Sequence, residues 1–413
     1  MNPQEEISNH RAAGQVQRKR LQSVADFLVV GICTASLAII VVGICAALLG
    51  NHAAGSRDFV EYWASGQLLA HHANPYDGDA ILKIERSVGG YPSDLPPLIM
   101  WNPPPALLLV LPLGFVGSRA GELLWSLLLL ACLFASVRMV WIMHNCPNKL
   151  LNLLGYSFAP ALVCILAGQV SIFVLLGLVL FLRLHKSRPF FAGISLWLCL
   201  LKPHLFLPFG VVLLVWAIAT RSYKLLAGVA VALGFSAGVV FLWDPSAWLQ
   251  YRHMMNTVST ERMQQELIPC LSIMLRWTIS RKTMWLQYLP PALACVWALL
   301  YFRRHRDNWD WMEHGSLLML VSVLLAPYTW LLDQAILIPA LLHAAYLTRS
   351  RNAIAVLALA SAAIDIGALG GVVVLHSLLY LWTGPAWLAW YLYATRRGNT
   401  MTVCEPALLL TAR

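Results

Sequence analysis

NHAAGSRDFVEYWASGQLLAHHANPYDGDAILKIERSVGGYPSDLPPLIMWNPPP, residues 51 to 105, is a polar, acid-bearing segment that follows almost directly on the first hydrophobic run of the chain. A segment of this composition cannot lie in hydrocarbon, because each unpaired backbone group or charge there costs several kcal/mol. We therefore expect an aqueous loop over 51 to 101. Asp58 lies close to the end of the hydrophobic run at 27 to 49, so a carboxylate is placed at the membrane surface. A reactive group at that depth suits a lipid-borne substrate.

Composition indicates an all-α polytopic membrane protein. Apolar residues make up 59% of the 413 residues and charged residues only 12%, whereas soluble domains carry about 25% charge. The net charge of +10 does not indicate a nucleic-acid partner here, since the basic residues cluster between hydrophobic runs as orientation signals do. The nine cysteines are scattered through apolar segments without a CxxC pattern, so neither a zinc site nor a disulfide framework is indicated.

The hydrophobic runs predict twelve transmembrane helices in a domain from 27 to 395. Residues 1 to 26 and 396 to 413 are expected to be cytoplasmic tails, and a second large outer loop is expected at 244 to 283. The predicted spans are 27 to 49, 121 to 143, 150 to 167, 170 to 184, 189 to 201, 205 to 220, 223 to 243, 284 to 302, 313 to 330, 334 to 348, 352 to 366 and 371 to 395.

A further apolar run at 102 to 117 decides the topology. If it spans the membrane, four basic clusters fall outside, which the positive-inside rule disfavours. If it enters and returns, all four fall inside. Pro112 and Gly114 break a helix where such a turn needs it, so we interpret the run as a re-entrant or interfacial element. The four clusters are 183 to 188, 221 to 224, 303 to 306 and 348 to 351.

This topology places several polar turns on the outer side. The turn at Lys202 is the clearest functional candidate among them. A lysine in the middle of CLLKPHLF contradicts the orientation signal, and an intramembrane cation is a functional-site candidate by default. The alternative is a snorkelling lysine without a functional role. Similar turns occur at Gln169 and between Tyr328 and Asp333.

The order of motifs resembles a known family. RDFVEYWASGQLL with NPYD, WNPPP before LPLGF, AGQVSIFVLLGL, LLKPHLFL and LAPYTWLLDQAILIPAL resemble glycosyltransferase family 87 over about 58 to 345. Each motif alone is weak, but five in the right order are fairly specific.

The resemblance implies a GT-C type fold with an outward-facing site, a polyprenyl-phosphate sugar donor, inversion at the anomeric carbon and no essential metal or cofactor. Asp58 matches the acidic residue regarded as the catalytic base, and Lys202 matches the lysine near the donor phosphate. The chain departs from the mannolipid-making branch at the late motif, where Leu331 and Leu332 follow Trp330 and the polar residue is Asp333. The sugar and the acceptor therefore stay open.

The same chemistry can be argued from the residues. Transfer from a polyprenyl phosphate needs a base for the acceptor hydroxyl and partners for the departing phosphate. Asp58 supplies the carboxylate, while Lys202, together with His204, is expected to bind the phosphate. Arg57 would keep Asp58 ionised or bind phosphate itself. The alternative for Asp58 is a capping role at the start of a helix over 58 to 70.

Other side chains are candidate substrate ligands. Glu61 and Tyr62 would share the face of that helix with Asp58, although a solvated face explains them equally well. Gln169 is predicted to bind sugar hydroxyls or to cap a helix. Tyr328 and Asp333 complete the expected set. His52, His71 and His72 have no metal-ligand spacing, so no metal is expected.

Two functional hypotheses remain. In the first, the chain transfers a hexose, with mannose the expected sugar, from a lipid-linked donor to a lipid or glycan acceptor on the periplasmic side of a bacterial inner membrane. In the second it is a transporter or flippase. Transporters generally show two related halves, and no internal repeat is visible, so the enzyme is favoured. Membrane lipids are the other expected partner.

Overall fold

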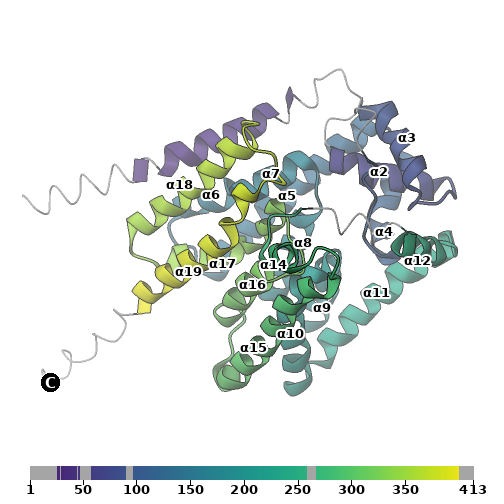
Figure 1. Ribbon diagram of the computed structural model, residues 1–413. Helices are drawn as coiled ribbons and strands as arrows, with labels where there is room; N and C mark the ends of the chain where they lie inside the picture. The colour runs from purple at the N-terminus through teal and green to yellow at the C-terminus, as the bar shows by residue number, and fades with distance from the viewer. Residues whose placement is uncertain are drawn as a thin grey trace, which may run out of the picture.

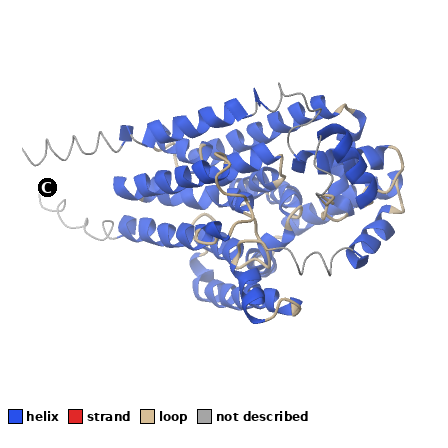
Figure 2. Cartoon of the chain, turned by 45° about the horizontal axis from the view of Figure 1, so that its top comes forward, coloured by secondary structure: helices blue, strands red, loops and turns tan. Residues whose placement is uncertain are grey.

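The computed structural model describes residues 26–27, 29–43, 45–46, 57–89, 96–257 and 267–399. All regular secondary structure among these residues is helical, as predicted, and they contain no strand. Most of both predicted tails and parts of the two outer loops lie outside the described residues. Figure 2 shows many of the helices running side by side along the molecule.

Four helices within the described ranges are long and apolar enough to cross a membrane, or five if a pair bent by 47° is counted as one span. The four are α5 (Ser118–Met143), α11 (Tyr223–Trp243), Met284–Asn308, which contains α15 (Leu289–His305), and α18 (Arg351–Ala368). The bent pair joins Lys149–Tyr156, which contains α6 (Asn152–Tyr156), to α7 (Ala159–Ala167).

The remaining helices are shorter than a simple span. The apolar ones are Val29–Gly43, Pro104–Phe115, α8 (Ser171–Leu184), α9 (Pro189–Cys199), Pro203–Ala219 with α10 (Leu207–Ala219), α16 (His314–Leu324) and Leu331–Leu347 with α17 (Ile338–Leu347). The others are α2 (Arg57–Ala70), α3 (Gly78–Gly89), α12 (Ala247–Thr257), α14 (Leu271–Ile279) and α19 (Thr383–Asn399). Each of the twelve predicted runs thus contains a helix, but the count of twelve spans stays a prediction.

The last predicted span is shifted relative to the sequence. A run from 371 to 395 was expected, whereas α19 begins at Thr383, and turns with a 3₁₀ segment at Leu378–Tyr380 occupy much of 369 to 382. The difference has a local cause, because Gly370 and Gly371 follow the end of α18, and glycine commonly terminates a helix.

The run at 102 to 117 forms no continuous helix. It is divided into a 3₁₀ turn (Pro104–Ala106), α4 (Leu107–Val110) and a second 3₁₀ segment (Leu111–Phe115). Pro104–Phe115 would measure about 18 Å as an α-helix, at 1.5 Å per residue, against about 30 Å for the hydrocarbon core. This segment is therefore too short to cross the membrane as a straight helix.

Two glycines let this broken segment pack closely against α2, the helix that carries Asp58. A Cβ on Gly66 would lie 2.3 Å from the carbonyl oxygen of Val110, and one on Gly114 would lie 2.2 Å from the carbonyl oxygen of Gly66. The Trp63 indole donates to the carbonyl of Val116 at 2.9 Å, and Gln67 Nε2 donates to that of Gly114 at 2.8 Å. These contacts fix α2 against the segment 104 to 116.

Asp365, an acid in α18 whose partner the sequence does not reveal, bonds to the first helix. Ser36 Oγ donates to Asp365 Oδ2 at 2.6 Å, and Asp365 is 2% exposed. Figure 1 shows the N-terminal helix, in purple, lying beside α18. Asp365 therefore links α18 to the helix Val29–Gly43.

We predict that Gly66→Ala destabilises the protein by about 1 to 3 kcal/mol, the range for overpacking, because the added methyl group would meet backbone rather than a flexible side chain. Gly210→Ala in α10 is the matched control. A Cβ there meets nothing within 4 Å, so alanine should be neutral or stabilise by about 0.5 to 1 kcal/mol. Unfolding of the detergent-solubilised variants measures both changes, and equal effects would contradict the close approach of α2.

The predicted topology places α3 outside the cell and the α8–α9 turn inside. In a background without native cysteines, Asp79→Cys should react with an impermeant thiol reagent on intact cells, and Ser187→Cys should react only after permeabilisation; both positions are exposed on the protein surface. Labelling of both from the same side would rule out the non-spanning interpretation of 102 to 117.

Candidate active site

A cavity of about 490 Å³ lies at the ends of several helices. Its walls come from α2, the segment 98 to 103, the α7–α8 and α9–α10 turns, α12, α14 and the residues just before it, the 3₁₀ segment Met284–Tyr288 and the segment before α17. Eight of the nine side chains predicted from the sequence line it: Asp58, Glu61, Tyr62, Gln169, Lys202, His204, Tyr328 and Asp333. The side chain of the ninth, Arg57, lies outside the described structure.

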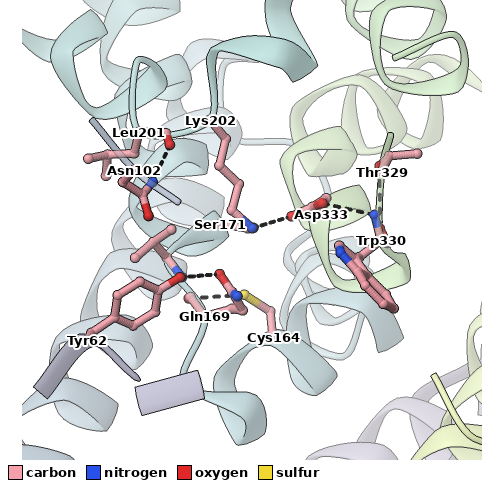
Figure 3. Close-up of polar contacts among 11 residues, drawn as sticks. Tyr62, Asn102, Cys164, Gln169, Ser171, Leu201, Lys202, Thr329, Trp330 and Asp333 are labelled. Atoms are coloured by element: carbon pink, nitrogen blue, oxygen red, sulfur yellow. Dashed lines mark hydrogen bonds and ion pairs between the residues drawn. The ribbon is translucent and has the colours of Figure 1, made fainter. Parts of the chain in front are cut away.

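Lys202 and Asp333 form a buried ion pair (Figure 3). Lys202 Nζ lies 2.6 Å from Asp333 Oδ1, and the two residues are 9% and 1% exposed. Ser171 Oγ donates to the same carboxylate oxygen at 2.8 Å, and the backbone N–H of Trp330 donates to Oδ2 at 2.9 Å. Lys202, predicted to bind phosphate, and Asp333, predicted to bind substrate, therefore contact each other. The contact lies where the α9–α10 turn, the start of α8 and the segment before α17 meet.

The Asp333 carboxylate stays ionised despite its burial. Burial would raise the pKa of Asp333, but the adjacent Lys202 ammonium outweighs it and holds that pKa below its usual value. The carboxylate is therefore ionised at neutral pH. The positive charge of Lys202 is balanced inside the cavity before any ligand binds.

His204 differs from the cationic phosphate partner that was expected. Its ring stacks on Tyr328 with centroids 3.9 Å apart, and burial lowers its pKa to about 3. Although the residue as a whole is partly exposed, its Nε2 atom is buried and has no hydrogen-bond partner in the described structure. His204 is therefore neutral at physiological pH and offers a ligand a ring nitrogen rather than a charge.

Tyr62 and Gln169 are tied together by a hydrogen bond. The Tyr62 hydroxyl donates to Gln169 Oε1 at 2.7 Å, and the Val170 N–H donates to the same oxygen at 3.1 Å. The Gln169 oxygen is thus occupied, so its NH₂ group is what remains for a ligand. The preceding Gly168 has φ +77° and lies so close to α2 that a Cβ would be 2.7 Å from the Cβ of Phe59. Only glycine satisfies both constraints.

Asp58 and Glu61 project from the first two turns of α2. Because they are three residues apart on a helix, they lie on the same face, and both line the cavity. The helix N-terminus favours negative charge at Asp58. The described helix begins at Arg57, which places Asp58 within the first turn rather than at the capping position. This position does not favour the capping alternative, while the role of general base stays a prediction.

Three polar residues of this region were not identified from the sequence. Ser171 belongs to the AGQVSIFVLLGL motif and Asn102 to the WNPPP motif, so a motif-based search could have included them. Asn102 Nδ2 donates to the carbonyl of Leu201 at 2.5 Å and so joins the outer segment to the Lys202 turn. The third, Gln287, lies in the apolar run MWLQYLP, where no local signal marks it. The described residues include no group of three or more potential ligands that could hold a metal ion.

Apolar helices around a cavity lined by charged side chains define a polytopic membrane protein with a site for a partly polar ligand. The model of glycosyltransferase family 87 matches residues 101–327, more than half of the chain, and the chain belongs to this family. It is therefore a membrane glycosyltransferase, which favours the enzyme over the transporter hypothesis. The matched residues include Gln169, Lys202 and His204 but neither α2 nor Asp333. No curated protein and no solved structure matches the chain.

We predict that Lys202→Met destabilises the protein by about 3 to 5 kcal/mol, because it leaves the Asp333 carboxylate buried without its counter-ion. The double variant Lys202→Met/Asp333→Asn should recover most of this loss. Asparagine removes the negative charge, and its single oxygen can still accept from the Trp330 N–H. Its NH₂ group then takes the place of Oδ1 and can donate to the Ser171 hydroxyl, which accepts as well as donates. Unfolding in detergent measures the cycle, and a double variant as unstable as the sum of the two single variants would show that the pair is not coupled.

Proposed function

We propose that the protein transfers a hexose, with mannose as the first candidate, from a polyprenyl-phosphate donor to a hydroxyl group of a lipid or glycan acceptor, with inversion. The observation that carries this proposal is the cavity lined both by Asp58 and Glu61, from α2, and by the Lys202–Asp333 pair, from other parts of the chain. An inverting transfer needs these two kinds of group on opposite sides of the anomeric carbon.

In the proposed step, Asp58 accepts the proton of the acceptor hydroxyl as the acceptor oxygen bonds to the anomeric carbon. The bond from that carbon to the phosphate oxygen breaks, and polyprenyl phosphate leaves with the electron pair. Lys202 stabilises the departing phosphate. An ammonium group has three N–H donors, so Lys202 can keep its contact with Asp333 and still donate to phosphate.

The uncharged part of the cavity suits the rest of the donor. Apolar and aromatic side chains line it beside the polar groups, which matches a ligand with a polar head and a hydrocarbon chain; they include Leu98, Ile99, Trp101 and Met255. The orientation of the basic clusters supports a site that faces the periplasm of a bacterial inner membrane.

The test is to incubate the purified protein with polyprenyl-phosphate-mannose and candidate acceptors, and then to determine the mass and anomeric configuration of the product. We expect a product heavier by one hexose, with configuration opposite to that of the donor. Retention of configuration would contradict the role of Asp58, and transfer from a nucleotide sugar alone would contradict the donor class.

Asp58→Asn should lower the transfer rate by at least about 100-fold, because it removes the proton acceptor and a general base contributes about 100- to 10,000-fold. Donor binding and thermal stability should stay close to wild type, since asparagine keeps the shape of the side chain. Glu61→Gln is the matched control on the same helix face and should retain more activity. A folded Asp58→Asn protein that turns over at near wild-type rate would assign the base to another group.

A further inference from the structure

Gln287 is a buried polar side chain that lines the cavity and takes no part in the contacts described above. It lies in the 3₁₀ segment Met284–Tyr288 that precedes α15, and it is 3% exposed. Its Oε1 atom has no hydrogen-bond partner in the described part of the chain. An amide buried in this way destabilises the folded protein unless something else satisfies it.

Gln334 shows how a structural glutamine behaves in this fold. It is 4% exposed and thus about as buried as Gln287, but both the oxygen and the NH₂ group of its amide are hydrogen-bonded. Its Nε2 donates to Thr383 Oγ1 at 2.8 Å, and its Oε1 accepts from the Trp387 indole at 2.8 Å. Gln334 does not line the cavity. Gln334, whose amide is fully hydrogen-bonded inside the fold, therefore behaves as a structural residue. Gln287, whose amide oxygen has no partner in the described residues and which lines the cavity, behaves as a ligand-binding residue would.

The surroundings of Gln287 indicate what kind of ligand would satisfy it. Its segment packs against α14, whose Ile273 forms a small apolar cluster with Ile268 against the ring of Tyr328. All three side chains line the cavity, and none is charged. A neutral amide among apolar and aromatic groups suits hydroxyl groups better than it suits phosphate, because it offers both a donor and an acceptor but no charge.

The neighbouring wall has a second group of the same kind. His204 stacks on Tyr328, and its buried Nε2 also has no partner in the described residues. His204 is two residues from Lys202, so its uncharged ring adjoins the proposed phosphate site, and Gln287 lines the same cavity. A sugar joined to that phosphate would lie in the cavity that these groups share.

We propose that Gln287 binds hydroxyl groups of the sugar ring held in this cavity and so helps to determine which sugar is accepted. This inference rests on the proposed glycosyltransferase function. The ring belongs either to the donor or to a glycan acceptor, and both present the same hydroxyl chemistry. Gln287 acts here as a specificity residue, with no part in the proton transfer.

The experiment compares two lipids, polyprenyl-phosphate-mannose and polyprenyl phosphate without sugar, in binding to the wild-type protein and to Gln287→Met. The dissociation constant of the sugar-free lipid divided by that of polyprenyl-phosphate-mannose isolates the contribution of the sugar. We expect the variant to reduce this ratio by about 2- to 12-fold for each neutral hydrogen bond lost. Binding of the sugar-free lipid should stay within about twofold of wild type, because phosphate and hydrocarbon contacts are untouched.

Stability provides a second readout, which a structural role would move in the opposite direction. Gln287→Met removes a buried amide oxygen that has no hydrogen-bond partner in the described residues, so the melting temperature should stay equal or rise. Gln334→Met is the matched control. It removes the acceptor of the Trp387 indole, so it should lower the melting temperature and leave the ratio of dissociation constants unchanged.

The outcomes separate the two sources of sugar. If Gln287→Met reduces the ratio of dissociation constants, the ring that Gln287 binds belongs to the donor. If the ratio is unchanged but the KM for octyl mannoside as acceptor is raised, the ring belongs to the acceptor. A folded Gln287→Met protein that changes neither quantity overturns the proposal while the proposed function stands. If the wild-type protein binds neither lipid, the proposed function fails, and this inference fails with it.

Discussion

The contact between Lys202 and Asp333 is the interaction on which the proposed site depends. It joins two residues 131 positions apart in the chain and draws the α9–α10 turn to the segment before α17. Ser171, at the start of α8, bonds to the same carboxylate. Buried ion pairs contribute little net stability compared with apolar packing, whereas breaking one is costly. A pair in this position is therefore better explained by function than by folding.

The second constraint is the close packing that holds α2 beside this pair. Gly66 and Gly114 let two backbones approach, and Gly168 lets the α7–α8 turn reach Phe59 on α2. Asp58 thus enters the cavity from a helix that precedes the family-matched residues, while Lys202 comes from within them. The proposed base and the proposed phosphate partner are positioned by different parts of the chain, and backbone contacts at glycines set the position of the helix that bears the base.

Much of this arrangement could be predicted from the sequence, because the signals are strong and local. Long apolar runs indicate helices, and a lysine within an apolar run is conspicuous. The pairing of Lys202 with Asp333 could not be predicted, since it depends on how distant turns meet. The neutrality of His204 follows from burial against Tyr328, which no pattern encodes. Gln287 was missed because one amide in an apolar run has no periodicity, and its unpartnered oxygen becomes visible only in the fold.

The central claim is that this cavity holds the sugar phosphate during transfer. A structure of the protein with a polyprenyl-phosphate sugar bound tests it most directly. We expect a phosphate oxygen within hydrogen-bond distance of Lys202 Nζ, the anomeric carbon between that oxygen and Asp58, and the hydrocarbon chain against the apolar wall. A donor bound elsewhere, with the cavity unchanged and Lys202 contacting only Asp333 and no phosphate, would contradict it.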